Sequence, residues 1–219
     1  MNSHPKDARS VKKYGLALHT ASRQLGLAIS NFAGESRYAT WNLDRDLATH
    51  LHQHLVEFIQ PQTWADLAFI AVAKGPGGFT GTRIGMVTAR TLAQQLDIPI
   101  FAISTLAAFA YESNQKSTLN QDIALQMPAQ RGQLFGAVYS VNQDSGLTEL
   151  FPDTVMTPES WLEKLESWGD SYRLIEVASE LGASVSSVLE LAYLEWKMGL
   201  RPGWSDALPY YGQHPVKGH

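Results

Sequence analysis

The chain has 219 residues, 44% hydrophobic and 17% charged, which is long enough to bury a core as one large domain or two lobes. Its net charge of −4 and pI of about 6.0 argue against a protein that grips nucleic acid directly, because such proteins usually carry basic surfaces. It contains no cysteine, which excludes disulfides and thiol catalysis and fits a cytoplasmic protein. We expect no membrane span, because no apolar run approaches ~20 residues.

Residues 1–12 are polar and predict a disordered tail, and residues 13–104 predict a first lobe. Three β-rich runs, at 14–20, 24–31 and 36–43, predict an antiparallel meander. The elements expected next are a helix over 45–60 capped by Asp44, a strand over 67–74, a helix from about 82 to 96 and a strand over 99–103. This order is that of the ribonuclease-H-like unit from which actin- and hexokinase-like folds are built.

Residues 105–211 predict a second, reduced version of the same plan. Its expected elements are a helix over 105–113, strands over 122–128, 133–141 and 147–156, a helix over 158–168 opened by Thr157, a strand over 172–177 and a helix over 184–199. Residues 114–121 predict a linker, and residues 212–219 a polar tail. The expected fold is therefore a two-lobed α/β, actin-like ATPase fold with a reduced second lobe.

A glycine loop joins the predicted strand over 67–74 to the helix after it, with the sequence KGPGGFTGTRIG from Lys74 to Gly85. Such a loop offers backbone N–H groups that can hold an anion or another protein's backbone. It is neither a P-loop, which needs a Lys after Gly81, nor a dinucleotide loop, which needs a glycine where this chain has Thr80. The alternative is structural, with glycines that allow positive φ and close helix–strand contact. The candidate contact residues are Gly75, Gly77, Gly78, Thr80, Gly81 and Arg83.

A stripe of small residues follows at every fourth position of the predicted helix: Gly81, Gly85, Ala89 and Ala93. Another helix could approach such a stripe closely. If Ile84, Val87 or Leu92 faces inward, the small-residue stripe faces something else. We therefore expect this stripe to be an interface.

The loop also carries a resemblance. Residues 75–85, GPGGFTGTRIG, resemble the signature Gly-x-Gly-Pro-Gly-Ser-Phe-Thr-Gly-x-Arg-Ile-Gly of the TsaB (YeaZ) family, the dimerisation subunit of the bacterial machinery that makes threonylcarbamoyladenosine on transfer RNA. Further similarity at 18–21, 98–100 and 104–106 extends the resemblance over roughly residues 14–110.

The resemblance implies a non-catalytic dimerisation and scaffold subunit with no cofactor of its own. Its implied partners are a TsaD-like catalytic subunit and a TsaE-like ATPase, with transfer RNA contacted only through the complex and no membrane contact. The chain alone is expected to form a homodimer, and the helix bearing the stripe is expected to pack against the equivalent helices of a second subunit.

Two positions depart from the family pattern. Catalytic members of this fold carry an acidic residue at the tip of the first strand, where this chain has His19, and a second carboxylate position is occupied by Pro128. We therefore assign no catalytic residue and expect no metal-dependent hydrolysis or phosphoryl transfer by the chain alone. The remaining alternatives are a degenerate sugar-kinase-like ATPase, a peptidase, and a homodimer with a diverged role.

Other chemistry-bearing residues give weaker signals. His50 and His54 share a helix face with ligand spacing, but a solvated polar face is the favoured interpretation, because no Glu lies between them in the zinc-protease pattern and no Cys is available. Ser104 and the other serines lack a Gly-x-Ser-x-Gly elbow. Trp161 and Trp168 lie seven residues apart on one helix face, which favours core or interface packing over stacking on RNA bases.

Overall fold

The computed structural model describes residues 14–115, 121–142, 146–178 and 180–212, which form two sheets and five helices. The first sheet contains β1 (Tyr14–His19), β2 (Gln24–Ser30), β3 (Ser36–Asn42), β4 (Leu67–Ala73) and β5 (Ile100–Ile103). The second contains β6 (Asp122–Pro128), β7 (Leu134–Asn142), β8 (Gly146–Met156) and β9 (Tyr172–Glu176). The helices are α1 (Leu47–Ile59), α2 (Phe79–Leu96), α3 (Thr105–Gln115), α4 (Pro158–Glu166) and α5 (Val185–Lys197).

The two sheets share one plan. The strand order of the first is β3-β2-β1-β4-β5, with an antiparallel meander of β1 to β3 and with β4 and β5 parallel to β1. The second has the order β8-β7-β6-β9, with an antiparallel meander and one parallel strand. The predicted two-lobed α/β fold, with a second lobe one strand smaller, is confirmed.

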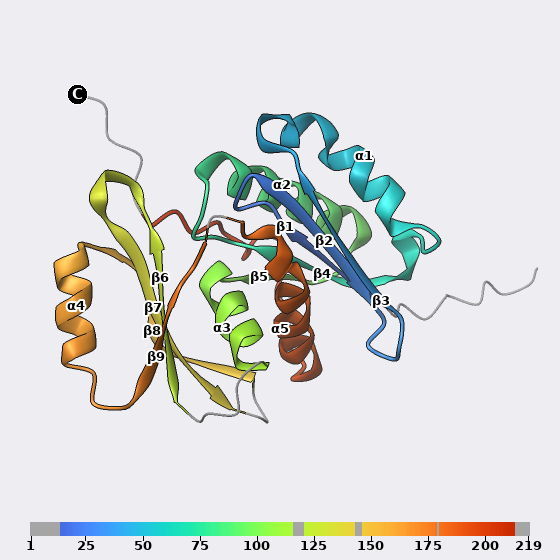
Figure 1. The fold of residues 1–219 in the computed structure, drawn as a ribbon. Helices are drawn as coiled ribbons and strands as arrows, with labels where there is room; N and C mark the ends of the chain where they lie inside the picture. Colours follow the sequence, from blue (N-terminus) through green and yellow to red (C-terminus); the bar gives the residue numbers. More distant parts are fainter. Residues whose placement is uncertain (1–13, 116–120, 143–145, 179, 213–219) are drawn as a thin grey trace, which may run out of the picture.

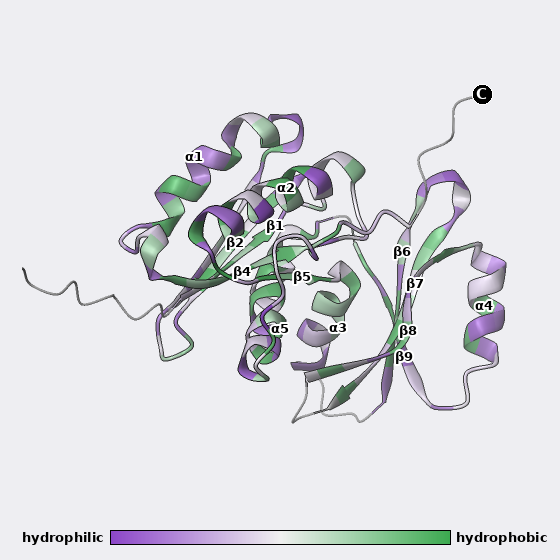
Figure 2. Cartoon of the chain, turned by 180° about the vertical axis from the view of Figure 1, so that it is seen from behind, coloured by the Kyte–Doolittle hydropathy of each residue, from purple (hydrophilic) through white to green (hydrophobic). Residues whose placement is uncertain are grey.

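The molecule has five layers, with α1 and α2 outside the first sheet, α3 and α5 between the sheets, and α4 outside the second (Figure 1). Alternation along β1 explains the first two interfaces, because Leu16 and Leu18 face the α1–α2 side while Ala17 faces α5. Small residues on the α5 side let that helix approach the sheet closely. Figure 2 shows the complementary pattern, with hydrophilic residues along the outward sides of α1 and α4.

Helices α3 and α4 cover the two faces of the second sheet. Leu106 and Ala110 of α3 pack with Leu125 and Ala137, whereas Ala108 turns toward the first sheet, so α3 serves both lobes. On the outer face Trp161 of α4 is buried against β6 and β7. The predicted cap of α4 is confirmed, since Thr157 Oγ1 accepts a hydrogen bond from Ser160 N at 3.2 Å.

The chain path differs from the prediction in the second half. Helix α5, predicted within the second lobe, packs on β1, β2 and β4 of the first sheet, and the segment after it stays there, with Ile100 N donating to Pro202 O at 3.1 Å. The second lobe is thus an insertion within the first rather than a C-terminal half. The predicted tail at 1–12, all of the predicted tail at 212–219 except Gly212, and most of the linker over 114–121 lie outside the described residues.

The start of α1 also differs. Asp44 has a positive φ of 45° and lies in a 3-10 turn over Asp44–Asp46, and its side chain makes no capping bond. It forms instead an exposed ion pair with Arg23 at 3.7 Å. The predicted cap at Asp44 is therefore wrong. The α-helix begins at Leu47, two residues after the predicted start.

Candidate functional site

The glycine loop connects the end of β4 to α2, as predicted, but the helix begins at Phe79, three residues earlier than expected. Gly78 occupies the N-cap position without a side-chain hydrogen bond. Its N–H donates to Ala21 O at 2.7 Å, and Thr105 N donates to Gly75 O at 2.9 Å. Two backbone groups of the loop are therefore already hydrogen-bonded within the chain, one to the residues after β1 and one to the start of α3.

Glycine is required in this loop by close packing. Gly75 has φ +100°, and a Cβ there would lie 2.4 Å from Tyr210 O. A Cβ on Gly77 would lie 2.3 Å from Ala21 O, and one on Gly81 would lie 2.1 Å from Thr20 O. Thr20 Oγ1 in turn donates to the carbonyl of Gly81 at 2.8 Å. Close packing within the chain is therefore enough to explain why glycine occupies these three positions, whatever else the loop contacts.

The small-residue stripe faces inward, so its prediction as an interface is wrong. Gly85, Ala89 and Ala93 are buried within this chain, and a Cβ on Gly85 would lie 2.0 Å from Thr20 Oγ1. The physical reason is that the tip of β1 comes so close to the first turns of α2 that only small residues fit there. Ile84 and Leu92, expected to fill the core, are half-buried at its edge.

The outward face of α2 consists of other residues: Phe79, Thr80, Arg83 and Val87. Val87, also expected to face inward, is 55% exposed. Phe79 packs against Tyr211 with ring centroids 4.5 Å apart and ring planes tilted by 40°, and it keeps 44% of its surface exposed. Thr80 and Arg83 are the two candidate contact residues of the glycine loop whose side chains are available to another molecule.

His19, at the tip of β1, is fully buried. Burial lowers the pKa of its imidazole to about 3, so the ring is neutral at physiological pH. Ala21 N donates to Nδ1 at 3.4 Å, which places the ring proton on Nε2, and Nε2 has no hydrogen-bond partner among the described residues. A neutral, enclosed imidazole cannot supply the fixed negative charge that a catalytic carboxylate supplies at this position.

A polar network that sequence reasoning missed lies between the lobes. Tyr139 of β7 donates its hydroxyl to Asp153 Oδ1 of β8 at 3.0 Å, and the same hydroxyl lies 3.4 Å from Ser104 Oγ at the start of α3. Burial raises the pKa of both Tyr139 and Asp153. Ser104 is thus placed beside a tyrosine and a carboxyl group, not in an Asp–His–Ser triad. Its Oγ also accepts from Ala107 N, which makes it the cap of α3.

The C-terminal segment joins this network to the glycine loop. Tyr210 donates its backbone N–H to Lys74 O at 2.7 Å and its hydroxyl to the carbonyl oxygen of Asp153. Burial and the neighbouring Asp153 raise the pKa of Tyr210 to about 12. Lys74 partly offsets the burial that raises the pKa values of Asp153 and Glu195. These groups bind the lobes together, and no local sequence pattern linked them.

His50 and His54 of α1 have local partners. His54 stacks on Trp41 with ring centroids 4.5 Å apart, and His50 Nδ1 lies 3.2 Å from the carbonyl oxygen of Asp46. Across the described ranges, histidine, aspartate and glutamate side chains form no group of three suited to a metal ion. Trp161 of α4 is a core residue, whereas Trp168 lies two residues beyond the end of α4 and is half-buried, with its Nε1 donating to Asp122.

The second carboxylate position gives no acidic group either. Pro128 ends β6, and a short turn over Gln130–Gly132 leads to β7, with Arg131 in the left-handed region at φ 57°.

In the part of the chain that the structure describes, no helix is both long and apolar enough to cross a bilayer.

Comparisons with known proteins give a family model and curated relatives with two different names, TsaD and TsaB, both of tRNA threonylcarbamoyladenosine formation. The family model described as TsaD, tRNA N6-adenosine threonylcarbamoyltransferase, matches residues 47–188, more than half of the chain. The tRNA threonylcarbamoyladenosine biosynthesis protein TsaB of Bacillus subtilis is 41% identical over 46% of this chain and 42% of its own. TsaB of Buchnera aphidicola from Acyrthosiphon pisum is 30% identical over 61% of each chain.

These matches to the curated relatives span less than two thirds of either protein's length. The solved structure of YeaZ from Pseudomonas aeruginosa superposes with a TM-score of 0.73 at 22% identity, covering 90% of this chain and all of that one. At this identity the superposition establishes the shared fold.

Proposed function

Because this chain belongs to the TsaB (YeaZ) family, we propose that it is a non-catalytic scaffold subunit of the assembly that forms N6-threonylcarbamoyladenosine at position 37 of transfer RNA. The observation that carries the proposal is His19. A fully buried, neutral imidazole takes the place of the acid that catalytic members of the fold present at the tip of β1. In the second lobe, the position where the fold's second carboxylate is expected is likewise occupied by a residue without charge, Pro128. Such a site favours support of a catalytic partner over catalysis.

The partners in this proposal are a TsaD-like catalytic subunit and a TsaE-like ATPase, with a homodimer when the chain is alone. Transfer RNA is contacted through the assembly, which is placed in the cytoplasm. The contact surface is the outward face of α2, where Thr80, Arg83 and Val87 are exposed beside the ring contact of Phe79 with Tyr211. An apolar patch next to an arginine is the composition that interface centres favour.

The test is reconstitution. Purified chain is added to a TsaD-like subunit and a TsaE-like ATPase from the same source, and threonylcarbamoyladenosine on transfer RNA is measured by mass spectrometry. The expected result is modification that depends on the chain, and no ATP hydrolysis or peptide cleavage by the chain alone. Turnover of either substrate by the purified chain would support the ATPase or peptidase alternative.

The surface is tested with Arg83→Glu and Val87→Asp, separately. Each is expected to weaken capture of the TsaD-like subunit at least ten-fold while leaving thermal stability unchanged, because both side chains are exposed. Leu162→Asp is the matched control, since Leu162 is 57% exposed on α4, beyond the second sheet. Equal capture by all three variants would place the interface elsewhere.

A further inference from the structure

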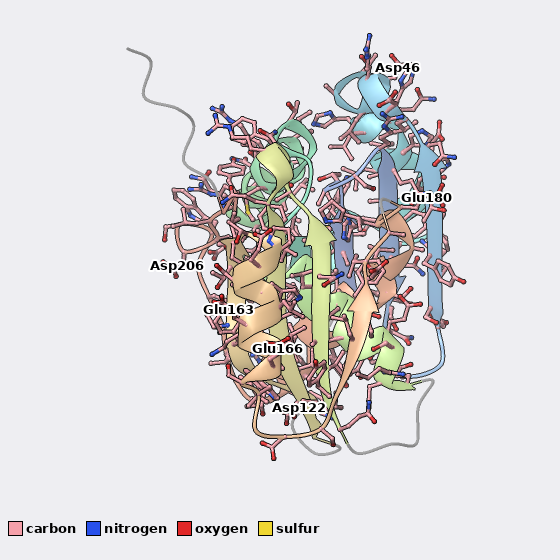
Figure 3. The ribbon with its side chains drawn as sticks, turned by 60° about the vertical axis from the view of Figure 1, so that its left-hand side comes forward. Asp46, Asp122, Glu163, Glu166, Glu180 and Asp206 are labelled. Atoms are coloured by element: carbon pink, nitrogen blue, oxygen red, sulfur yellow. The ribbon has the colours of Figure 1, made fainter. Side chains whose placement is uncertain are left out.

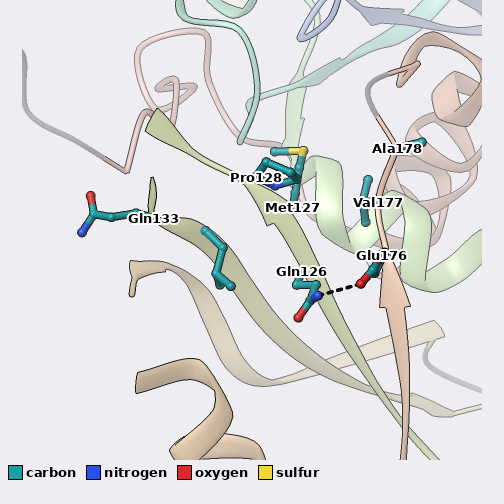
Figure 4. Close-up of a pocket in the computed structure, with 8 residues that line it drawn as sticks. Gln126, Met127, Pro128, Gln133, Glu176, Val177 and Ala178 are labelled. Carbon is teal, nitrogen blue, oxygen red and sulfur yellow. Dashed lines mark hydrogen bonds between the residues drawn. The ribbon is translucent and has the colours of Figure 1, made fainter. Parts of the chain in front are cut away.

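A pocket of about 410 Å³ opens in the second lobe near the carboxyl ends of β6 and β9 (Figure 4). Its lining residues are Gln126, Met127, Pro128, Gln133, Leu134, Glu176, Val177 and Ala178. None of them belongs to the glycine loop, to α2 or to the network around Asp153. We call it the Glu176 pocket.

The Glu176 pocket combines apolar walls with one fixed carboxylate. Leu134 and Pro128, on the same face of the sheet as Gln126 and Glu176, give it hydrocarbon surface. Gln126 is held at both ends, because its Oε1 accepts from Trp161 Nε1 at 2.9 Å and its Nε2 donates to Glu176 Oε1 at 3.1 Å (Figure 4). The bond to Gln126 positions Glu176 and leaves capacity on the carboxylate for a further donor, since an ionised carboxylate accepts about four hydrogen bonds.

The surrounding lobe is strongly acidic. Residues 122–180 contain ten acidic and three basic residues, whereas residues 1–104 contain seven acidic and ten basic ones. Two of the three bases are engaged, because Lys164 lies over the rings of Phe151 and Trp168 and Arg173 donates to Ser113 O. Figure 3 shows Asp122, Glu163 and Glu166 on the α4 side of this lobe. The net charge of this segment favours cations over phosphate, and its third base, Arg131, lies in the turn between Pro128 and Gln133.

We propose that the Glu176 pocket receives an arginine side chain from a basic segment of a partner protein. The methylene stem lies along the apolar walls, and the guanidinium donates to the carboxylate of Glu176 in a planar, charge-assisted pair. Arginine fits better than lysine because its fork matches a carboxylate and is more weakly hydrated. The inference goes beyond the proposed function, since it adds a contact surface on the lobe remote from the outward face of α2 and stands whether or not that function holds.

The first experiment locates the binding. The ¹⁵N-labelled full chain is titrated with acetyl-Leu-Arg-Leu-Arg-Leu-amide, with the peptide in which glutamate replaces arginine, and with free arginine. The arginine peptide is expected to shift the amides of 126–127, 133–134 and 176–178, and the glutamate peptide is expected to shift none. Free arginine is expected to bind at least five-fold more weakly than the peptide. Equal binding of free arginine would assign the pocket to the amino acid instead of a protein segment and overturn the proposal.

The second experiment separates the pocket from diffuse charge. Glu176→Gln removes the pocket carboxylate, and Ala178→Trp fills the pocket at constant charge; each is expected to weaken the arginine peptide at least five-fold. Glu163→Gln, which removes the same charge from the exposed face of α4, is the matched control and is expected to change affinity less than two-fold. If Glu163→Gln weakens binding as much as Glu176→Gln, or if Ala178→Trp binds like the wild type, attraction is only diffuse and the proposal fails. Spectra outside the pocket verify that each variant is folded.

Discussion

At the scale of single residues, His19 makes stability depend on pH. Its pKa is about 3 when folded and 6.5 when unfolded, so the folded state disfavours the charged form. The stabilising contribution of this group is complete above pH 6.5 and is lost as pH falls, because the unfolded chain takes up the proton first.

We expect His19 to reduce the free energy of unfolding by about 1.4 kcal/mol between pH 7.5 and 5.5. Urea unfolding at both pH values measures it as the difference between the wild type and His19→Leu. Asp153 and Glu195, whose raised pKa values act in the opposite direction, are present in both proteins and cancel. An identical pH dependence in the two proteins would contradict the assignment.

A second residue-scale prediction concerns the bond between Tyr139 and Asp153. Tyr139→Phe should cost about 1–2 kcal/mol at pH 7, since it removes the buried hydroxyl that donates to the half-buried carboxylate of Asp153. In an Asp153→Asn background the same change should cost less, because no charge is left without its donor. Urea unfolding of the double-mutant cycle gives the coupling, and simple additivity of the two changes would show that the bond contributes nothing specific.

At the scale of elements, Gly85 gives a prediction whose sign is diagnostic. In an exposed helix, Gly→Ala usually stabilises by about 0.5–1 kcal/mol. Gly85→Ala should instead destabilise by about 1–3 kcal/mol, because the new Cβ meets Thr20 Oγ1 at 2.0 Å.

Two comparisons complete this test, with thermal unfolding as the measurement. Gly169→Ala is the matched control, since a Cβ there meets nothing within 4 Å, and it should be neutral. Thr20→Ala should recover part of the loss when combined with Gly85→Ala. A stabilising Gly85→Ala would mean that α2 is not held this close to β1.

The element bounds were largely predictable, and the reason is local. Alternation and turn residues define the strands to within one or two residues, and Thr157 marks the start of α4 by its own hydrogen bond. The start of α2 carries no such mark, because Gly78 caps it without a side chain. Asp44 is a residue type that often caps helices, but its φ is positive, so its backbone does not have the conformation of an N-cap.

Periodicity also could not tell which face of α2 lies inward. Small and large residues both repeat along this helix, and the choice depends on how close the tip of β1 approaches, which is a tertiary fact. The network around Asp153 was equally hidden. Its hydrogen-bonded partners lie up to 57 residues apart in the sequence, and Pro152 interrupts the alternation of β8 beside it.

At the scale of the whole molecule, the segment after α5 straps the lobes together. Ala207 is buried in the first core, while Tyr210 reaches the glycine loop through Lys74 and the second lobe through Asp153. A chain that stops after Asp206 should lose about 2–4 kcal/mol of stability, from the buried Ala207, the half-buried aromatic ring of Tyr210 and two hydrogen bonds.

Hydrogen exchange of the truncated chain should accelerate at the glycine loop and in β8 together. A chain that stops after Gly212 keeps the strap and should match the full chain in both measurements. Faster exchange in β8 alone would show that Tyr210 belongs to the second lobe and does not couple the two.

The position of α5 has a consequence for synthesis on the ribosome. Sheet residues that emerge early, such as Ala17 and Ala28, wait for Val188 and Ala192 to cover them, and Ser22 and Gln24 bond to residues about 160 positions later. The second lobe, inserted between these halves, can close on α3 and α4 while the first is still incomplete. The nascent chain therefore carries an uncovered apolar sheet face until α5 has been synthesised. A fragment released by translation arrest before that point would expose this face and would be prone to aggregation.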